Sequence, residues 1–93
     1  MFILAKSTID PSNGDLFMQV FPQKFRSHKK AHAAMRKEYL KELEERGLED
    51  NNAVGDSYSG GYIDNDEAEI YDYLDYANCQ LLPVVLLAIY ELK

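Results

Sequence analysis

The segment from Ser27 to Arg46 constrains the fold most, because its length and periodicity are those of a complete helix. Ser27 is a typical helix cap, whose hydroxyl accepts a free backbone N–H of the first turn, and Gly47 is typical of the position after a helix. At about 100° per residue, one side of this helix is apolar. Its members are Ala33, Met35, Tyr39, Leu40 and Leu43. We therefore expect one helix, over about 27–46, to pack across one face of a sheet.

Two apolar segments before the helix predict a β-hairpin. Phe2–Ile9 and Leu16–Phe21 flank the turn-forming sequence Asp10–Asp15, in which Asn13-Gly14 can take the positive φ angles of a tight turn. Pro22 is expected to end the second strand, because proline has no N–H to donate to a neighbouring strand.

The second half of the chain is acidic and harder to assign. Residues 49–61 are polar and predict a surface loop, with Gly60-Gly61 as a turn. Residues 66–76 fit either of two structures. As a helix, this segment would have Asp64 as its cap. As a strand, it would place its tyrosines on a sheet surface. We favour the strand, because glycines precede the segment and because Tyr and Asp are middling helix formers.

Pro83–Leu92 is apolar on both faces, which is typical of a strand buried on both sides. Together these elements predict an α+β fold with the order ββαββ: a four-stranded antiparallel sheet with the helix across one face. Ninety-three residues make a single small domain, 1–93. Since one helix covers one face, we expect the other face to be covered by the 49–61 loop or by a second copy in a homodimer.

Charge is divided unevenly along the chain, whose net charge is −6. Residues 1–37 carry seven Lys or Arg against two Asp, whereas residues 47–92 carry ten Asp or Glu and neither Lys nor Arg. The acidic total disfavours binding to nucleic acid or to an anionic membrane, although the basic first third does not.

Basic side chains gather around the start of the helix, where the helix dipole disfavours them. They are Lys24, Arg26, Lys29, Lys30 and Arg36. One interpretation is that Lys24, Arg26, Lys29 and Lys30 pair with the acidic second half of the chain. The other is that segment 24–37 binds an anion or a nucleic acid, because basic side chains and free N–H groups converge there.

Catalytic and metal-binding patterns are incomplete in this sequence. His28 and His32 have the i, i+4 spacing of metal ligands, but the glutamate of a zinc-protease motif is missing. The acidic run from Asp64 lacks the glycine and final glutamate of a calcium loop. We expect no enzyme, no metal and no cofactor. A single cysteine, Cys79, is typical of the reducing cytoplasm, and the apolar run Leu81–Tyr90 is too short to span a bilayer.

Tyrosines alternate with acidic residues between positions 56 and 75, and tyrosine is enriched at binding surfaces. The alternative is that the rings cover the sheet while the carboxylates keep the protein soluble. We expect a non-catalytic protein-interaction module, accessory or inhibitory, that binds a basic partner protein. The candidate binding residues are Tyr58, Tyr62, Asp66, Glu69, Tyr71, Asp72 and Tyr73.

The chain begins with Met1-Phe2-Ile3, has its helix at Ser27–Gly47, continues through Gly61-Tyr62-Ile63-Asp64 and ends with Ile89-Tyr90-Glu91-Leu92. Over most of the chain this layout resembles that of small uncharacterised proteins of bacterial phages and mobile elements. The resemblance carries no particular activity. It implies an accessory or host-directed inhibitor protein.

Overall fold

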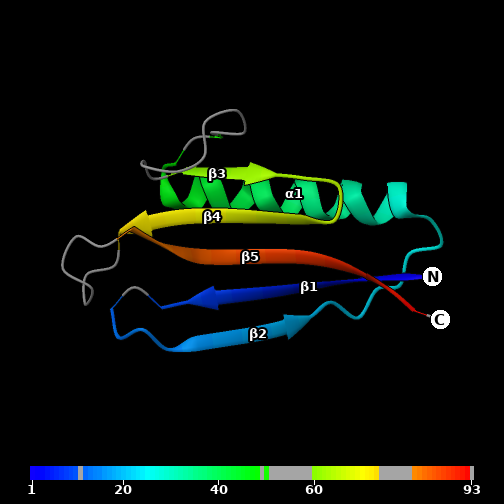
Figure 1. Ribbon diagram of the computed structural model, residues 1–93, viewed down its shortest axis with the longest axis horizontal. Coiled ribbons are helices and arrows are strands. Elements are labelled where there is room, and N and C mark those ends of the chain that lie inside the picture. The colour runs from blue at the N-terminus through cyan, green and yellow to red at the C-terminus, as the bar shows by residue number, and fades with distance from the viewer. Residues whose placement is uncertain (11, 49, 51–59, 74–80, 93) are drawn as a thin grey trace.

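The computed structural model describes residues 1–10, 12–48, 50, 60–73 and 81–92 (Figure 1). The elements in chain order are β1 (Phe2–Ile9), β2 (Leu16–Val20), α1 (His28–Arg46), β3 (Gly60–Ile63), β4 (Glu67–Tyr73) and β5 (Leu81–Glu91). The strands form one antiparallel sheet in the order β2-β1-β5-β4-β3, and α1 lies against one face. The expected α+β fold with one helix across an antiparallel sheet is confirmed. The predicted number of strands, four, is wrong, because the sheet has five.

The predicted hairpin is confirmed, and its turn is held by backbone hydrogen bonds. β1 and β2 pair antiparallel, with Ile9 opposite Leu16 at the turn end. The N–H of Asp10 donates to the carbonyl of Asp15, and the N–H of Gly14 donates back to the carbonyl of Asp10, both at 2.8 Å. Gly14 takes a φ of 79°, as a tight turn of this kind requires.

Both ends of the helix also lie where the sequence places them. The Ser27 hydroxyl accepts a hydrogen bond from the Lys30 N–H at 3.2 Å, which caps the first turn. Gly47 takes the left-handed conformation (φ 67°), and its N–H donates to the carbonyls of Glu44 and Leu43. The predicted span of about 27–46 is therefore confirmed by a helix of residues 28–46 with Ser27 as its cap.

The buried side of α1 differs in part from the predicted apolar side. Met35, Tyr39 and Leu43 are buried as expected, but Leu40 is 43% exposed and Ala33 is exposed as well. Glu42 is buried in their place. The helix contacts β1, β3, β4 and β5 but not β2, so β2 extends beyond it.

The sequence does not predict β3, because the adjacent glycines Gly60-Gly61 indicate a turn. A Cβ on Gly61 would lie 2.8 Å from the Tyr39 ring carbon Cε1 and 2.8 Å from the Glu69 carbonyl oxygen. Glycine is therefore required here for the close approach of a helix side chain to the strand rather than for a turn. The rest of the predicted loop, from residue 51 to residue 59, lies outside the described residues.

The favoured strand in the acidic segment is confirmed as β4, and residues 74–76 of the prediction lie outside the described residues. β5 begins at Leu81, two residues before the predicted start, and pairs with β1 on one side and β4 on the other. The register of β4 and β5 shifts beside Pro83, so the proline lies at an irregularity of the ladder. The prediction that β5 is buried on both faces is wrong, since Leu86 is 38% exposed and Tyr90 is 55% exposed.

The sheet therefore has a face that no described element covers, which we call the open face. Alternation along each strand, combined with the registers, places the following side chains there: Ile3, Ala5, Ser7, Ile9, Leu16, Met18, Val20, Tyr62, Glu67, Glu69, Tyr71, Pro83, Leu86, Ala88 and Tyr90. The core lies on the other side, where Leu4, Ile70 and Leu87 pack against α1. The open face is thus largely apolar over β2, β1 and β5, and carries acids and tyrosines over β4 and β3.

Candidate protein-binding surface

The β3–β4 hairpin brings together three of the residues predicted to bind a partner. Tyr62 of β3 lies directly opposite Glu69 of β4, and Tyr71 lies two residues further along β4 on the same face. The Tyr71 hydroxyl donates a hydrogen bond to the Glu69 carboxylate. One carboxylate is therefore positioned between two phenol rings on the open face.

Glu69 also affects the acidity of both phenols. Burial and the hydrogen bond with Glu69 raise the pKa of Tyr62 to about 12. For Tyr71, the hydrogen bond with Glu69 is the larger cause and burial the smaller, and together they raise the pKa to about 12. Both phenols remain protonated at neutral pH, so they stay available as donors toward the carboxylate.

An open pocket of about 410 Å³ lies on the other side of Glu69, between the strands of the open face. Its lining is mostly apolar and consists of Ser7, Ile9, Leu16, Met18, Glu69, Pro83, Val84 and Leu86. Glu69 has Tyr62 opposite on β3 and Leu86 opposite on β5. This glutamate thus marks the boundary between an apolar cavity and an aromatic, acidic surface.

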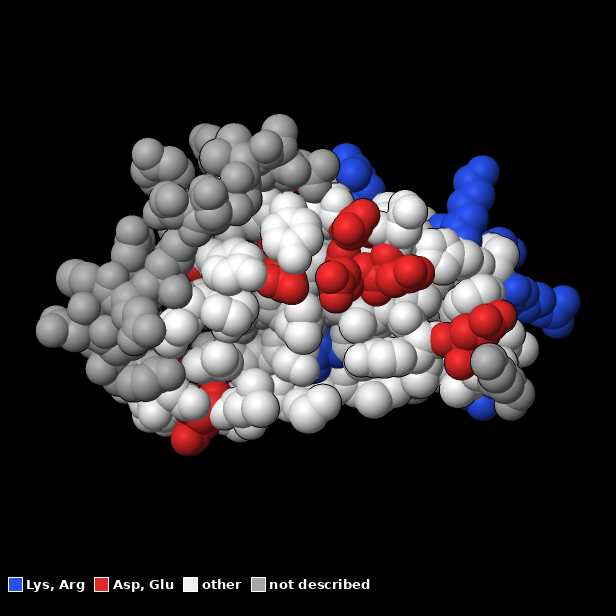
Figure 2. Space-filling view, in the orientation of Figure 1, with Lys and Arg blue, Asp and Glu red and all other residues white. Residues whose placement is uncertain are grey.

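The charge on the open face follows the same division. Figure 2 shows this face, with the largest group of Asp and Glu over β3 and β4 beside white aromatic rings, and smaller groups towards the two ends of the molecule. Most of the visible Lys and Arg lie towards the end of the molecule where α1 begins. A partner that approaches the middle of this face therefore meets negative charge and apolar surface together.

Asp66, another predicted binding residue, lies away from this group, at the turn between β3 and β4. Its Oδ1 is 2.7 Å from Nε2 of His28, and Nε2 of His32 is 3.1 Å from the Asp64 carbonyl oxygen. The two imidazole rings stack with centroids 6.3 Å apart. These contacts fasten the turn to the first turns of α1. Within the part of the chain that the structure describes, no three metal-ligating side chains cluster.

Asp72, another member of the predicted binding set, does not join this group. Alternation along β4 places Asp72 on the face opposite to Tyr71, and Asp72 is half-buried. Tyr58 and the side chain of Tyr73 lie outside the described residues. The structure thus assembles Tyr62, Glu69 and Tyr71, to which the pairing of β4 and β5 adds Glu67, a residue outside the predicted binding set.

The basic residues at the start of the helix are all exposed: Lys24, Arg26, Lys29, Lys30 and Arg36. In the described part of the chain none of these five forms an ion pair with the acidic second half. The start of the helix contacts that half through His28, which lies beside the Asp66 carboxylate, and through His32, which lies beside the Asp64 carbonyl. The pairing of these basic residues with the acidic half, one of the two interpretations of the sequence, is therefore not seen among the described residues.

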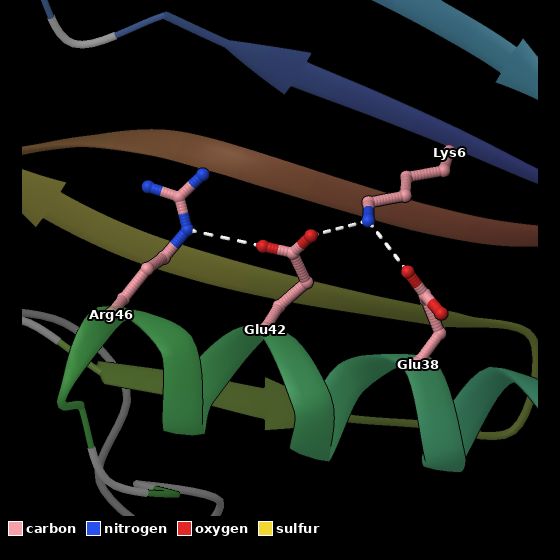
Figure 3. A network of polar contacts seen from close by, with 4 residues as sticks. All are labelled: Lys6, Glu38, Glu42 and Arg46. Atoms are coloured by element: carbon pink, nitrogen blue, oxygen red, sulfur yellow. Dashed lines mark hydrogen bonds and ion pairs between the residues drawn. The ribbon is translucent and has the colours of Figure 1, made fainter.

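A second polar cluster, which the sequence did not predict, joins β1 to α1 (Figure 3). Lys6 Nζ lies 2.7 Å from Glu38 Oε1 and also contacts Glu42 Oε1, while Glu42 Oε2 is 3.3 Å from Arg46 Nε. Each side chain is at most 20% exposed. Two features of the sequence could have indicated this cluster. Lys6 shares a strand face with the apolar Phe2 and Leu4, and the helix carries Glu38 and Glu42 one turn apart.

Each charge in this cluster stabilises the ionised form of its neighbours. Burial alone would lower the pKa of Lys6, but the hydrogen bonds and charges of Glu38 and Glu42 outweigh it and raise that pKa. Burial alone would raise the pKa of Glu42, but Lys6 and Arg46 outweigh it and lower that pKa. The cluster therefore acts as an ionic clamp between sheet and helix, with its charges compensated internally.

Comparison with protein-family models, with curated proteins and with solved structures gives no match. The similarity to small proteins of phages and mobile elements therefore stays a prediction. Within the described residues, no helix combines the length and the apolar character needed to cross a membrane.

Proposed function

We propose that this protein is a non-catalytic interaction module that binds a partner protein on the open face of its sheet. The observation that carries the proposal is the position of Glu69 between an apolar pocket and two tyrosine rings. Such a site fits a segment in which a Lys or Arg lies beside a large apolar side chain.

The apolar side chain of the partner would enter the pocket lined by Met18, Val84 and Leu86. Its cation would pair with Glu69 and lie against the rings of Tyr62 and Tyr71, where the ring faces attract positive charge. The hydrogen bond from Tyr71 fixes the carboxylate in advance, which lowers the ordering cost on binding. The net charge of −6 supports association with a basic partner.

The experiment uses the whole protein as bait in a lysate treated with nuclease, followed by peptides from the captured protein. Binding is measured by fluorescence anisotropy for the wild type and for the double variant Tyr62→Ala/Tyr71→Ala. Aromatic anchors of this kind contribute about 2 kcal/mol or more each, so removing both should cost about 4 kcal/mol and lower the affinity by on the order of a thousandfold.

Tyr90→Ala is the matched control, because Tyr90 is an exposed tyrosine of the same face outside the acidic group. It should leave the affinity close to that of the wild type. Circular dichroism establishes that each variant is folded. Unchanged affinity in a folded Tyr62→Ala/Tyr71→Ala variant, or equal losses in both variants, would contradict the proposed surface.

A second candidate function is nucleic-acid or anion binding through segment 24–37. It is favoured by one observation: the five cations named above are exposed, without an ion pair to the acidic half among the described residues. Such binding weakens steeply as salt concentration rises. Capture that disappears after nuclease treatment, together with a steep salt dependence, would favour this function over protein binding.

A further inference from the structure

β2 is an edge strand without the features that normally protect an edge from pairing. All five of its residues are exposed, and Met18 is 75% exposed. From Leu16 to Gln23 the sequence holds no charged residue, and proline comes only after the strand has ended. Natural edge strands are usually blocked by charge, proline or a bulge, and β2 has none of these.

Three residues of β2 direct their backbone N–H and C=O groups towards the outer edge of the sheet. The N–H of Phe21 donates to the Leu4 carbonyl at 2.9 Å, so Phe21 faces β1. Because inward and outward groups alternate in an antiparallel ladder, Leu16, Met18 and Val20 direct their N–H and C=O groups away from β1. At the opposite edge, β3 has only four residues, and Asp50 bridges to Gly61.

We propose that β2 pairs antiparallel with β2 of a second copy, about a twofold axis through Met18. Met18 then lies opposite the partner's Met18, and Leu16 lies opposite the partner's Val20. This register overlaps the full length of the strand and satisfies all of its outward backbone groups. Two five-stranded sheets become one continuous sheet, and both open faces remain accessible on the same side.

Charge at the two ends of β2 selects this partner and this orientation. The turn before the strand carries Asp10 and Asp15, and the segment after it carries Lys24 and Arg26. Antiparallel pairing places the acidic end of each copy beside the basic end of the other, whereas parallel pairing would oppose like charges. It also places the acidic strands β3 and β4 of the two copies at the far edges of the joined sheet.

Disulfide trapping tests the register directly. In a background with Cys79→Ser, Met18→Cys should give a covalent dimer on oxidation, because opposed residues of a hydrogen-bonded pair have Cα atoms about 5.5 Å apart, within disulfide range. Val20→Cys is the matched control on the same face. Its Cα lies four residues from the Cα of its symmetry mate, about 13 Å away, so it should not cross-link.

Sedimentation equilibrium tests the association itself. The wild type should sediment as a dimer, and Met18→Lys should raise the dissociation constant at least about tenfold, since it opposes two like charges at the axis. Tyr90→Lys places the same charge on the open face away from β2 and should leave the dimer intact. A monomeric wild type, or equal cross-linking of both cysteine variants, overturns the proposal. So does loss of the dimer in Tyr90→Lys, which would indicate packing of two open faces.

Discussion

Replacing Lys6 with methionine removes the cation that Glu38 and Glu42 share in the ionic clamp. Methionine keeps most of the apolar stem and its packing, so the change acts mainly on charge. Glu42 retains Arg46 at 3.3 Å, but Glu38 loses the ion pair that it makes at 2.7 Å. Two carboxylates one helical turn apart then remain at a site where their side chains are only 11% and 19% exposed.

The expected loss follows from this burial. Removing one partner of a fully buried ion pair costs about 3–5 kcal/mol, because the remaining charge has lost its compensation. Partial exposure and the contact with Arg46 reduce that figure, so we expect the free energy of unfolding to fall by about 2–3 kcal/mol. For a domain of this size the midpoint of thermal unfolding should fall by about 10–20 °C.

The loss should also depend on pH. In the wild type the lowered pKa of Glu42 contributes stability that is present above 4.5, its usual value, and is lost as pH falls through the folded-state pKa. The raised pKa of Lys6 contributes stability that is present below 10.5 and is lost as pH rises through the folded-state pKa. The wild type and Lys6→Met should therefore differ most at neutral pH and converge in acid, once pH has fallen through the lowered pKa of Glu42, and in strong alkali.

Urea denaturation followed by far-ultraviolet circular dichroism or by tyrosine fluorescence measures this difference, since the chain contains no tryptophan. Lys41→Met, which removes the same charge from an exposed helix position, should cost less than about 0.5 kcal/mol. In the double variant Lys6→Met/Glu38→Met, much of the loss should be recovered, because the second change removes the carboxylate that Lys6→Met leaves without a counter-charge. A loss below about 0.5 kcal/mol for Lys6→Met, or equal losses with and without Glu38, would refute the assignment of these contacts as a clamp.

The remaining predictions concern Gly61 and Glu69. Gly61→Ala should lower the free energy of unfolding by about 1–3 kcal/mol, since its Cβ would overlap a buried ring and a carbonyl. Gly47→Ala, which has open space but a φ of 67°, should cost only about 1 kcal/mol, and the reverse order would contradict this account. In Glu69→Gln, absorbance or NMR titration should show both raised phenol pKa values falling from about 12, more for Tyr71 than for Tyr62, where burial comes first. Phenols that still titrate near 12 would show that Glu69 is not the cause.

Local signals in the sequence predict the hairpin and the helix because the chemistry that sets them is local. Ser27 and Gly47 act on backbone groups within their own turns, and the turn at Gly14 is complete within six residues. The choice between Leu40 and Glu42 for the buried side of the helix is not local. Glu42 is buried because Lys6, on a strand 36 positions earlier, supplies its counter-charge.

The sequence fails to predict β3 for a similar reason. Two adjacent glycines usually indicate a turn, and only the position of Tyr39 in the folded protein shows that Gly61 is needed for space. Without β3, the sequence identifies the tyrosines and acids of the candidate surface but not their grouping. The pairing of Tyr62 with Glu69, and the placement of Asp72 on the other face, both follow from the register of β3 and β4.

The sheet order has a consequence for the way in which the chain folds during its synthesis. Among the strands that the structure describes, β5 comes last in sequence, yet it lies at the centre of the sheet and joins the β1–β2 hairpin to β4 and β3. Until residues up to Glu91 have been made, these two hairpins have no strand between them, and α1 has no continuous surface to cover. β1 can pair early with β2, but its second partner, β5, lies almost the whole chain away. Closure of the sheet is therefore a late, long-range step of the kind that slows folding.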